Sequence, residues 1–335
     1  QTIIQPNAFG KHILFEANLK PTKKCFPFGV QYFQKKAQKL ISKALDSAQQ
    51  KMGPVHINVP FDEPLYETVN QPIAIKSILK KELHDTPVKI SNSTLKTWQN
   101  AKRKLVLVGV NPPNSLELSI LEHLANDPSV IVLTETTSNL HHPNFFPSID
   151  QLIAPLKKNE FKQLQPDLLI TFGGLIVSKK IKAFLREYKP NQHWHIDTYK
   201  ANDTYFCLNN HFKCTPNSFF KSLFISSKST NSTYFETWNA IKQWRLKSHL
   251  DYLKSMPFSD FKAFELISKA IPKNYMVQSG NSSAIRYLQL FEFDSSIHLY
   301  CNRGTSGIDG STSTAVGAAV VSQLPTLLIT GDLSF

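Results

Sequence analysis

The first part of the chain carries apolar residues on one face of a predicted helix, followed by a short buried strand. The helical period is made by Val30, Phe33, Ala37, Leu40, Ile41, Ala44, Leu45 and Ala48. Gly53 and Pro54 break this period, and residues 55–59 predict a strand that Pro60 ends. A parallel strand needs neighbours on both sides. We therefore expect residues 1–66 to be the C-terminal part of a larger α/β domain.

Strands and helices alternate through the middle of the chain. Residues 67–91 show no clear period and contain Pro72 and Pro87, which is typical of a linker. Residues 92–224 predict strands and helices in turn, with strands at 104–110, 129–136, 167–172 and 193–199 and helices at 114–126 and 178–187. This alternation predicts a parallel sheet with helices on both faces. No complete Gly-x-Gly-x-x-Gly pattern follows the first strand, so the sequence does not indicate nucleotide binding there.

The last part of the chain predicts a second α/β unit. Residues 225–258 contain a long bridging helix at about 233–254. Residues 259–335 then begin with a helix and continue with strands at 275–278, 297–301 and 326–330 and helices at 282–290 and 312–322. Because the first block begins with its last helix and strand, and this unit stops directly after a strand, we expect the chain to lack both ends of its parent protein. The predicted fold class is α/β, with consecutive parallel-sheet domains that have helices on both faces.

Composition and charge narrow the function. Hydrophobic residues make up 41% of the 335 residues and charged residues 19%, which is typical of a globular protein. No apolar run reaches the roughly 20 residues that cross a bilayer, and no signal peptide opens the chain. The net charge of +13 indicates solvated lysines or attraction to phosphates and carboxylates. The lysines are spread out and no nucleic-acid module is present, so we expect no nucleic-acid partner.

The cysteines indicate the compartment rather than a metal site. Their spacing fits no metal-ligand pattern, and nothing implies an oxidising environment for Cys25, Cys207, Cys214 and Cys301. We therefore expect reduced thiols in a cytoplasmic protein.

Three predicted strand ends carry residues suited to anions. Residues 302–310 (NRGTSGIDG) place Arg303 among glycines, residues 280–286 (GNSSAIR) place Ser282 four residues before Arg286, and Asp332 follows Gly331. Ligands of open α/β sheets bind at the carboxyl ends of strands. Each motif alone also suits an ordinary turn or a capped helix. Together they predict a site for carboxylates or phosphates with a hard cation at the aspartate.

These motifs carry a resemblance to a known family. Residues 1–6, 53–65, 280–286, 302–310 and 331–335 resemble the thiamine-diphosphate-dependent enzymes, in the same order and at compatible spacing. Among them the chain is most similar to the family of 2-succinyl-5-enolpyruvyl-6-hydroxy-3-cyclohexene-1-carboxylate synthases of menaquinone biosynthesis. The resemblance is specific in the first and third blocks and loose in the middle one. It implies a thiamine-diphosphate-binding-type fold, with part of the pyrimidine-binding domain at 1–66, a central domain at 92–224 and part of the diphosphate-binding domain at 259–335.

The resemblance also implies the chemistry. Thiamine diphosphate would promote decarboxylation of 2-oxoglutarate, and the resulting succinyl-semialdehyde carbanion equivalent would add to isochorismate. The cofactor supplies the electron sink, and the protein supplies orientation and charge. In this family the active site forms between two subunits, so the resemblance implies a homodimer or homotetramer.

The cofactor residues implied by the resemblance lie in the third block. Asp332 matches a ligand of Mg²⁺ (or Mn²⁺), and Gly331 and Ser334 belong to the same diphosphate motif. Asn281 matches a residue at the turn near the diphosphate. Ile308 matches the apolar residue that bends the cofactor, and Ser306 lies in the loop that faces its aminopyrimidine ring.

The substrate residues implied by the resemblance come from all three blocks. Ser282, Arg286 and Arg303 match residues that hold substrate carboxylates. Gln5 matches an active-site glutamine of the first domain. Lys179 matches a basic residue that reaches from the central domain toward the isochorismate carboxylates.

Some positions depart from the family pattern. Ile4 stands where Asn is frequent, and Lys180 stands where Arg is common, which loses bidentate geometry. The family's activating Glu would lie upstream of Gln1, and its remaining metal ligands downstream of Phe335, so no catalytic residue is assigned here. We expect these 335 residues alone neither to retain the metal–cofactor complex tightly nor to turn over. Product formation by this polypeptide alone would contradict that expectation.

Three other interpretations stay open at this point. Another thiamine-dependent enzyme of the acetolactate-synthase type is one, although a monocarboxylate substrate would not need Arg286 together with Arg303. A non-catalytic basic α/β protein that binds nucleic acid or a protein partner is another, and steep salt dependence of nucleic-acid binding would reveal it. The third is an inactive remnant with a structural or regulatory role.

Overall fold

The computed structural model describes residues 4–20, 27–51, 53–61, 88–304 and 306–335. The chain forms two compact units, Gln1–His84 and Asp85–Phe335. Most of the predicted linker, residues 67–87, lies outside the described residues. In the part of the chain that the structure describes, no helix is long and apolar enough to cross a membrane.

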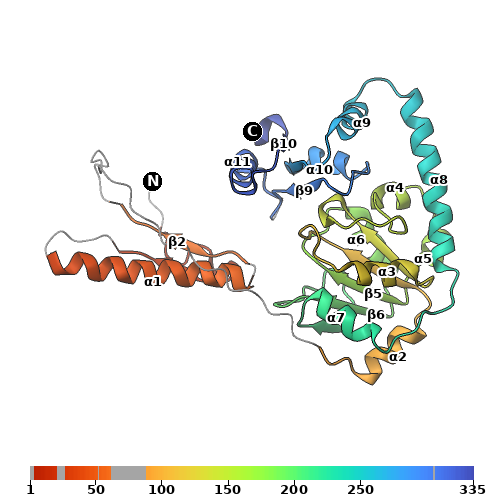
Figure 1. Ribbon diagram of the computed structural model, residues 1–335, viewed down its shortest axis with the longest axis horizontal. Coiled ribbons are helices and arrows are strands. Elements are labelled where there is room, and N and C mark those ends of the chain that lie inside the picture. The colour runs from red at the N-terminus through yellow and green to blue at the C-terminus, as the bar shows by residue number, and fades with distance from the viewer. Residues whose placement is uncertain (1–3, 21–26, 52, 62–87, 305) are drawn as a thin grey trace. The chain divides into compact units, whose positions relative to one another are not determined.

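The first unit pairs two short strands beside a long helix. Strand β1 (Glu16–Asn18) runs parallel to β2 (His56–Asn58), and helix α1 (Pro27–Lys51) packs on them (Figure 1). Ala17 of β1 and Ala44 of α1 are fully buried. The helix and β2 appear where the apolar pattern predicts them, whereas β1 was not predicted because its three residues include only one apolar side chain. A short 3-10 helix, η1 (Gly10–His12), precedes β1.

The second unit begins with a five-stranded parallel sheet. The strand order is β4-β3-β5-β6-β7, and the strands are β3 (Lys104–Val108), β4 (Val130–Thr134), β5 (Leu168–Phe172), β6 (Gln192–Ile196) and β7 (Asn210–Phe212). Every residue of β3, β4 and β5 is buried, as expected for central parallel strands.

Helices cover both faces of this sheet because side chains of successive strand residues point to opposite sides. On one face, Val106 and Val108 pack with α2 (Asn92–Asn100), α3 (Leu118–Asn126) and α7 (Pro216–Phe224). On the other face, Leu105 and Leu107 pack with α4 (Ile149–Ile153), α5 (Lys158–Leu164), α6 (Lys179–Glu187) and α8 (Tyr234–Ser255). The predicted α/β class is confirmed.

A second, three-stranded sheet follows the long helix α8. Its strands β8 (Met276–Ser279), β9 (His298–Cys301) and β10 (Thr326–Ile329) are all parallel, in the order β10-β8-β9. Its helices are α9 (Asp260–Ala270), α10 (Ser283–Leu288) and α11 (Ser311–Ser322), and a 3-10 helix, η3 (Asp332–Ser334), ends the chain (Figure 1). Val277, Ile285, Leu288 and Leu299 form the core between α10 and the sheet.

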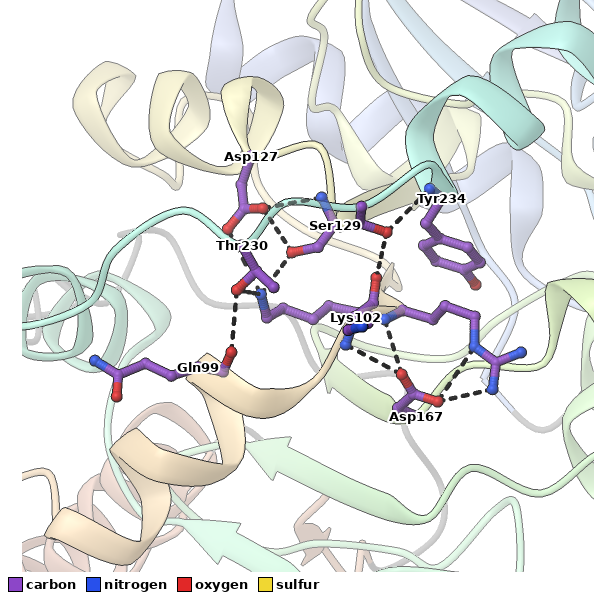
Figure 2. A network of polar contacts seen from close by, with 10 residues as sticks. Gln99, Lys102, Asp127, Ser129, Asp167, Thr230 and Tyr234 are labelled. Atoms are coloured by element: carbon purple, nitrogen blue, oxygen red, sulfur yellow. Dashed lines mark hydrogen bonds and ion pairs between the residues drawn. The ribbon is translucent and has the colours of Figure 1, made fainter.

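A polar network at the amino end of the five-stranded sheet holds the segment between α7 and α8. The ammonium of fully buried Lys104 donates to Ser129 Oγ at 2.6 Å and Thr230 Oγ1 at 3.0 Å, and lies 3.6 Å from Asp127 Oδ2. Figure 2 shows Thr230 and Gln99 joined in the same network, and Lys102 bonded to Asp167. These contacts lie at the amino end of the five-stranded sheet, whereas the predicted motifs follow the carboxyl ends of strands in the three-stranded sheet, so we assign the contacts a structural role.

Candidate functional site

The three predicted strand-end motifs lie at one edge of the three-stranded sheet. Parallel pairing aligns Ser279 of β8 with Ile329 of β10 on one side and Cys301 of β9 on the other. The three strands end at the same edge of the sheet, and the residues that follow them are Gly280, Asn302 and Thr330. A Cβ on Gly280 would lie 2.8 Å from Thr330 Oγ1, so only glycine lets these two turns approach so closely.

Arg303 joins the first two turns. Its Nη1 donates to Asn281 Oδ1 at 2.5 Å, and Asn281 Nδ2 donates to the Gly307 carbonyl at 3.2 Å. Asn302 Nδ2 closes the loop on itself by donating to the Asp309 carbonyl at 3.1 Å. Asn281 is buried and Arg303 half-buried, so the guanidinium lies where both loops meet.

Two serines in these turns have backbone angles that L residues rarely adopt. Ser282 has φ 71° and Ser306 has φ 80°. Positive φ at a non-glycine residue is uncommon and often marks a functional turn. Helix α10 begins at Ser283, one residue later than predicted, so Ser282 precedes the helix and does not share a helical face with Arg286. Its side chain makes no capping bond to the helix.

The third turn presents an exposed carboxylate. Asp332 Oδ1 accepts from Leu333 N at 2.9 Å, and Ser334 N donates to the Gly331 carbonyl at 3.1 Å. Ile308 is half-buried in the loop of the second turn. Within the described ranges, no group of three or more His, Cys, Asp and Glu residues is arranged to hold a metal ion. The exposed carboxylate of Asp332 is a group that can contribute one ligand to a hard cation.

Lys179 and Arg286 both line a cavity of about 350 Å³. Lys179 and Lys180 line it from the start of α6, and Arg286 and Gln289 line it from α10 and the residue after that helix. Both lysines and Arg286 are exposed. Three cations on facing elements can bind the two carboxylates of a small acid. Ser282 and Arg303 are not among the residues that line this cavity.

The start of α6 is fixed by a glycine contact with the end of β3. Gly174 N donates to the Val110 carbonyl at 2.8 Å, and Gly173 has φ 79°. A Cβ on Gly109 would lie 2.0 Å from the Gly174 carbonyl oxygen. Lys182 Nζ donates to the Ile176 carbonyl at 2.9 Å, and this bond joins the loop to helix α6. Burial lowers the pKa of Lys182, and the nearby positive charge of Arg303 lowers it further.

Glu135 also lines this cavity, and the sequence did not indicate it as a site residue. Its carboxylate, 3% exposed, accepts from Val177 N at 2.7 Å and from Ser178 N at 2.8 Å. Burial raises the pKa of Glu135 to about 7, the two N–H groups oppose that rise, and the negative charge of Asp150 adds to it. Its amide partners lie 42 and 43 residues away in sequence, and the apolar pattern placed Glu135 inside a strand. The only local signal was a charged residue near the end of a predicted buried strand.

Gln5 belongs to the other unit. It is exposed, and its carbonyl accepts from Ala8 N at 3.1 Å.

Comparison with known proteins shows the family. Residues 75–274 match the family model described as the middle domain of thiamine pyrophosphate enzymes. The chain belongs to this family. Those 200 residues span both the five-stranded sheet and the long helix α8, so the match includes helix α6, which begins with Lys179.

The relatives share one name. The chain is 50% identical over 338 residues to the 2-succinyl-5-enolpyruvyl-6-hydroxy-3-cyclohexene-1-carboxylate synthase of Flavobacterium johnsoniae, with 100% of this chain and 59% of the relative covered. It is 48% identical over 335 residues to the synthase of Flavobacterium psychrophilum, with 100% and 59% covered. It is 51% identical over 357 residues to that of Christiangramia forsetii, with 100% and 61% covered. The chain thus spans 59–61% of the length of these relatives.

Proposed function

We propose that the protein is a 2-succinyl-5-enolpyruvyl-6-hydroxy-3-cyclohexene-1-carboxylate synthase that uses thiamine diphosphate and Mg²⁺ (or Mn²⁺). It decarboxylates 2-oxoglutarate and joins the remaining succinyl unit to isochorismate, a step of menaquinone biosynthesis. The observation that supports it most is the parallel register of β8, β9 and β10, because this register brings Gly280, Arg303 and Asp332 to one edge. The cavity between Lys179 and Arg286 supports the dicarboxylate substrates.

We assign the cofactor to the strand-end edge. The exposed carboxylate of Asp332 suits a hard cation, and the open space around Gly331 leaves room for a diphosphate. Asn281 and Ser334 lie in the turns that would hold the diphosphate, and Ile308 and Ser306 would face the organic part of the cofactor. When bound, thiamine diphosphate supplies the electron sink for loss of carbon dioxide.

We assign substrate binding to the cations. Lys179 and Arg286 hold the carboxylates of isochorismate across the cavity, and Arg303, braced by Asn281, binds a carboxylate at the sheet edge. Ser282 offers a hydroxyl, and the resemblance implies that Gln5 is an active-site glutamine. Their fixed charges orient the acids.

The domain assignment is part of this proposal. Residues 1–66 form part of a pyrimidine-binding domain and 67–91 a linker, 92–224 a central domain, 225–258 a bridging segment, and 259–335 part of a diphosphate-binding domain. We further propose a cytoplasmic homodimer or homotetramer, because the resemblance to thiamine-diphosphate-dependent enzymes implies an active site formed between two subunits.

The test is product formation by the full-length protein. With thiamine diphosphate, Mg²⁺, 2-oxoglutarate and isochorismate, mass spectrometry is expected to detect the named product, and omitting the cofactor is expected to abolish it. Replacing 2-oxoglutarate by pyruvate is expected to lower kcat/KM by at least about 100-fold, because a pocket built for a second carboxylate leaves its cations unpaired. Equal use of pyruvate would favour an acetolactate-type synthase instead.

A further inference from the structure

Three residues that follow strand β4 contact three separate elements that carry the cations of the site. The residues are Glu135, Thr136 and Asn139, here called the positioning triplet. They flank the 3-10 helix η2 (Thr136–Ser138) or begin it. Each makes its contact through a polar group within the second unit, and the three contacts lie at the carboxyl end of the five-stranded sheet.

Glu135 fixes the start of α6. Its two carboxylate oxygens accept from Val177 N, at 3.0 and 2.7 Å, and Oε1 also accepts from Ser178 N at 2.8 Å. These backbone groups directly precede Lys179. A buried carboxylate that receives two N–H groups at a helix start is a strong, directional anchor. The backbone of Lys179 is therefore held by Glu135 from another strand of the sheet.

Thr136 reaches α10. Its N–H donates to Gln289 Oε1 at 3.3 Å. Gln289 is 8% exposed and caps the end of α10, three residues after Arg286. This bond places the last turn of α10 against the same segment that anchors α6.

Asn139 completes the edge of the three-stranded sheet. Leu299 N donates to Asn139 Oδ1 at 2.8 Å, and Asn139 Nδ2 donates to the Leu299 carbonyl at 3.0 Å. The side chain amide thus takes the place of a neighbouring strand beside β9, whose chain leads directly to Arg303. Asn139 has φ 48°, a left-handed backbone that asparagine tolerates better than most residues.

The triplet is itself fixed to the sheet. Ser138 Oγ donates to the Val108 carbonyl at 2.8 Å, and Glu135 N donates to Ser138 Oγ at 2.9 Å. Residues 135–139 are therefore hydrogen-bonded to strand β3. A segment fixed in this way can hold α6, α10 and β9 at defined positions relative to the five-stranded sheet.

We propose that Glu135, Thr136 and Asn139 are positioning residues that set the spacing of Lys179, Arg286 and Arg303 for a dicarboxylate substrate. The inference rests on the proposed function for the identity of the substrate. It adds that the cation spacing is set by hydrogen bonds from one segment, and that Glu135 acts on the substrate through Lys179.

The experiment is a double-mutant cycle between Glu135 and Lys179 in the full-length protein. Glu135→Ala is expected to raise the KM for isochorismate at least about tenfold, because a lost charge-assisted anchor displaces Lys179, while kcat changes less than about threefold. Glu135→Gln keeps one acceptor and is expected to raise KM by about threefold. In a Lys179→Ala background, either Glu135 variant is expected to change KM by less than about twofold, because its target is gone.

Thr137→Val is the matched control. Thr137 is buried in the same segment, and its hydroxyl has no hydrogen-bond partner among the described residues. The variant is expected to leave KM within about twofold of the wild-type value. If Glu135→Ala fails to fold, the cycle is carried by Glu135→Gln.

Two results would overturn the inference. One is a KM within about twofold of wild type for both Glu135 variants, and the other is the same fold-change with and without Lys179. The proposed function fails in a different way, since the wild-type protein would then form no product. In that case the same cycle is read from the dissociation constant for isochorismate measured by calorimetry, with the same expected coupling.

Discussion

The carboxyl group of Glu135 is buried, and its titration makes the stability of the folded protein depend on pH. Burial raises its pKa from 4.5 to about 7. Between these values the folded protein holds a proton that the unfolded chain has released, so the free energy of unfolding falls as pH rises. The contribution is fully present below pH 4.5 and is lost as pH rises through 7, and it amounts to roughly 3 kcal/mol at about 1.4 kcal/mol per pKa unit.

Glu135→Gln is expected to remove this dependence. Glutamine does not titrate, so the wild-type protein should lose stability relative to the variant between pH 5 and pH 8. Urea unfolding at a series of pH values measures the difference. A constant gap between the two proteins across that range would contradict the assignment.

The buried pair of Lys104 and Asp127 predicts a second effect at a single residue. Asp127→Asn leaves the fully buried ammonium of Lys104 without a carboxylate 3.6 Å away. Breaking one side of a buried pair is expected to cost about 3 kcal/mol of unfolding free energy. Asp251→Asn is the control, because its ion pair with Lys254 is exposed and should contribute less than about 1 kcal/mol. Equal losses in the two variants would show that Asp127 does not stabilise Lys104.

Single residues also show where sequence reasoning ends. Arg286, Arg303 and Asp332 could be singled out because each follows a predictable strand within a few residues. Glu135 and Asn139 could not, because their partners lie 42 and 160 residues away in sequence. Hydrogen bonds over such separations leave no pattern in a single chain.

At the scale of elements, apolar runs predicted the central strands and missed the short polar ones. Strands β3, β4 and β5 consist of buried residues throughout, so their pattern is strong. Strand β7 has the sequence Asn-His-Phe and is held by pairing with β6, which a local pattern does not show. Helix α3 begins at Leu118, four residues later than predicted, after Pro112, Pro113 and a left-handed Asn114.

Close packing of the loop before α6 on the end of β3 gives a prediction for two elements together. Gly109→Ala would place a methyl group 2.0 Å from the Gly174 carbonyl oxygen, so the backbone must move. We expect a loss of about 2 kcal/mol in unfolding free energy and a higher KM for isochorismate, because Lys179 follows that loop.

Gly317→Ala in α11 is the control, since no atom outside the neighbouring backbone of its own helix lies within 4 Å of the added methyl group. There, alanine should stabilise by up to about 1 kcal/mol. Unfolding by urea measures both, and a Gly109→Ala protein as stable as wild type would contradict the contact.

At the scale of the second unit, the residues that we propose to bind substrate and cofactor follow the carboxyl ends of strands in two parallel sheets. The five-stranded sheet contributes Lys179 through α6, and the three-stranded sheet contributes Arg286, Arg303 and Asp332. The sequence predicted each sheet, because alternating helices and strands require parallel pairing. It did not predict how one sheet is tied to the other, because Asn139 and Gln289 make that connection through side chains.

We place the cofactor at the edge formed by β8, β9 and β10, and cofactor affinity tests this placement most directly. Calorimetric titration of thiamine diphosphate into the full-length protein with Mg²⁺ should show binding to the wild type. Asp332→Asn should bind at least about tenfold more weakly, because the cation loses a charged ligand. Wild-type affinity in the Asp332→Asn protein would contradict the placement of the metal and diphosphate at this edge.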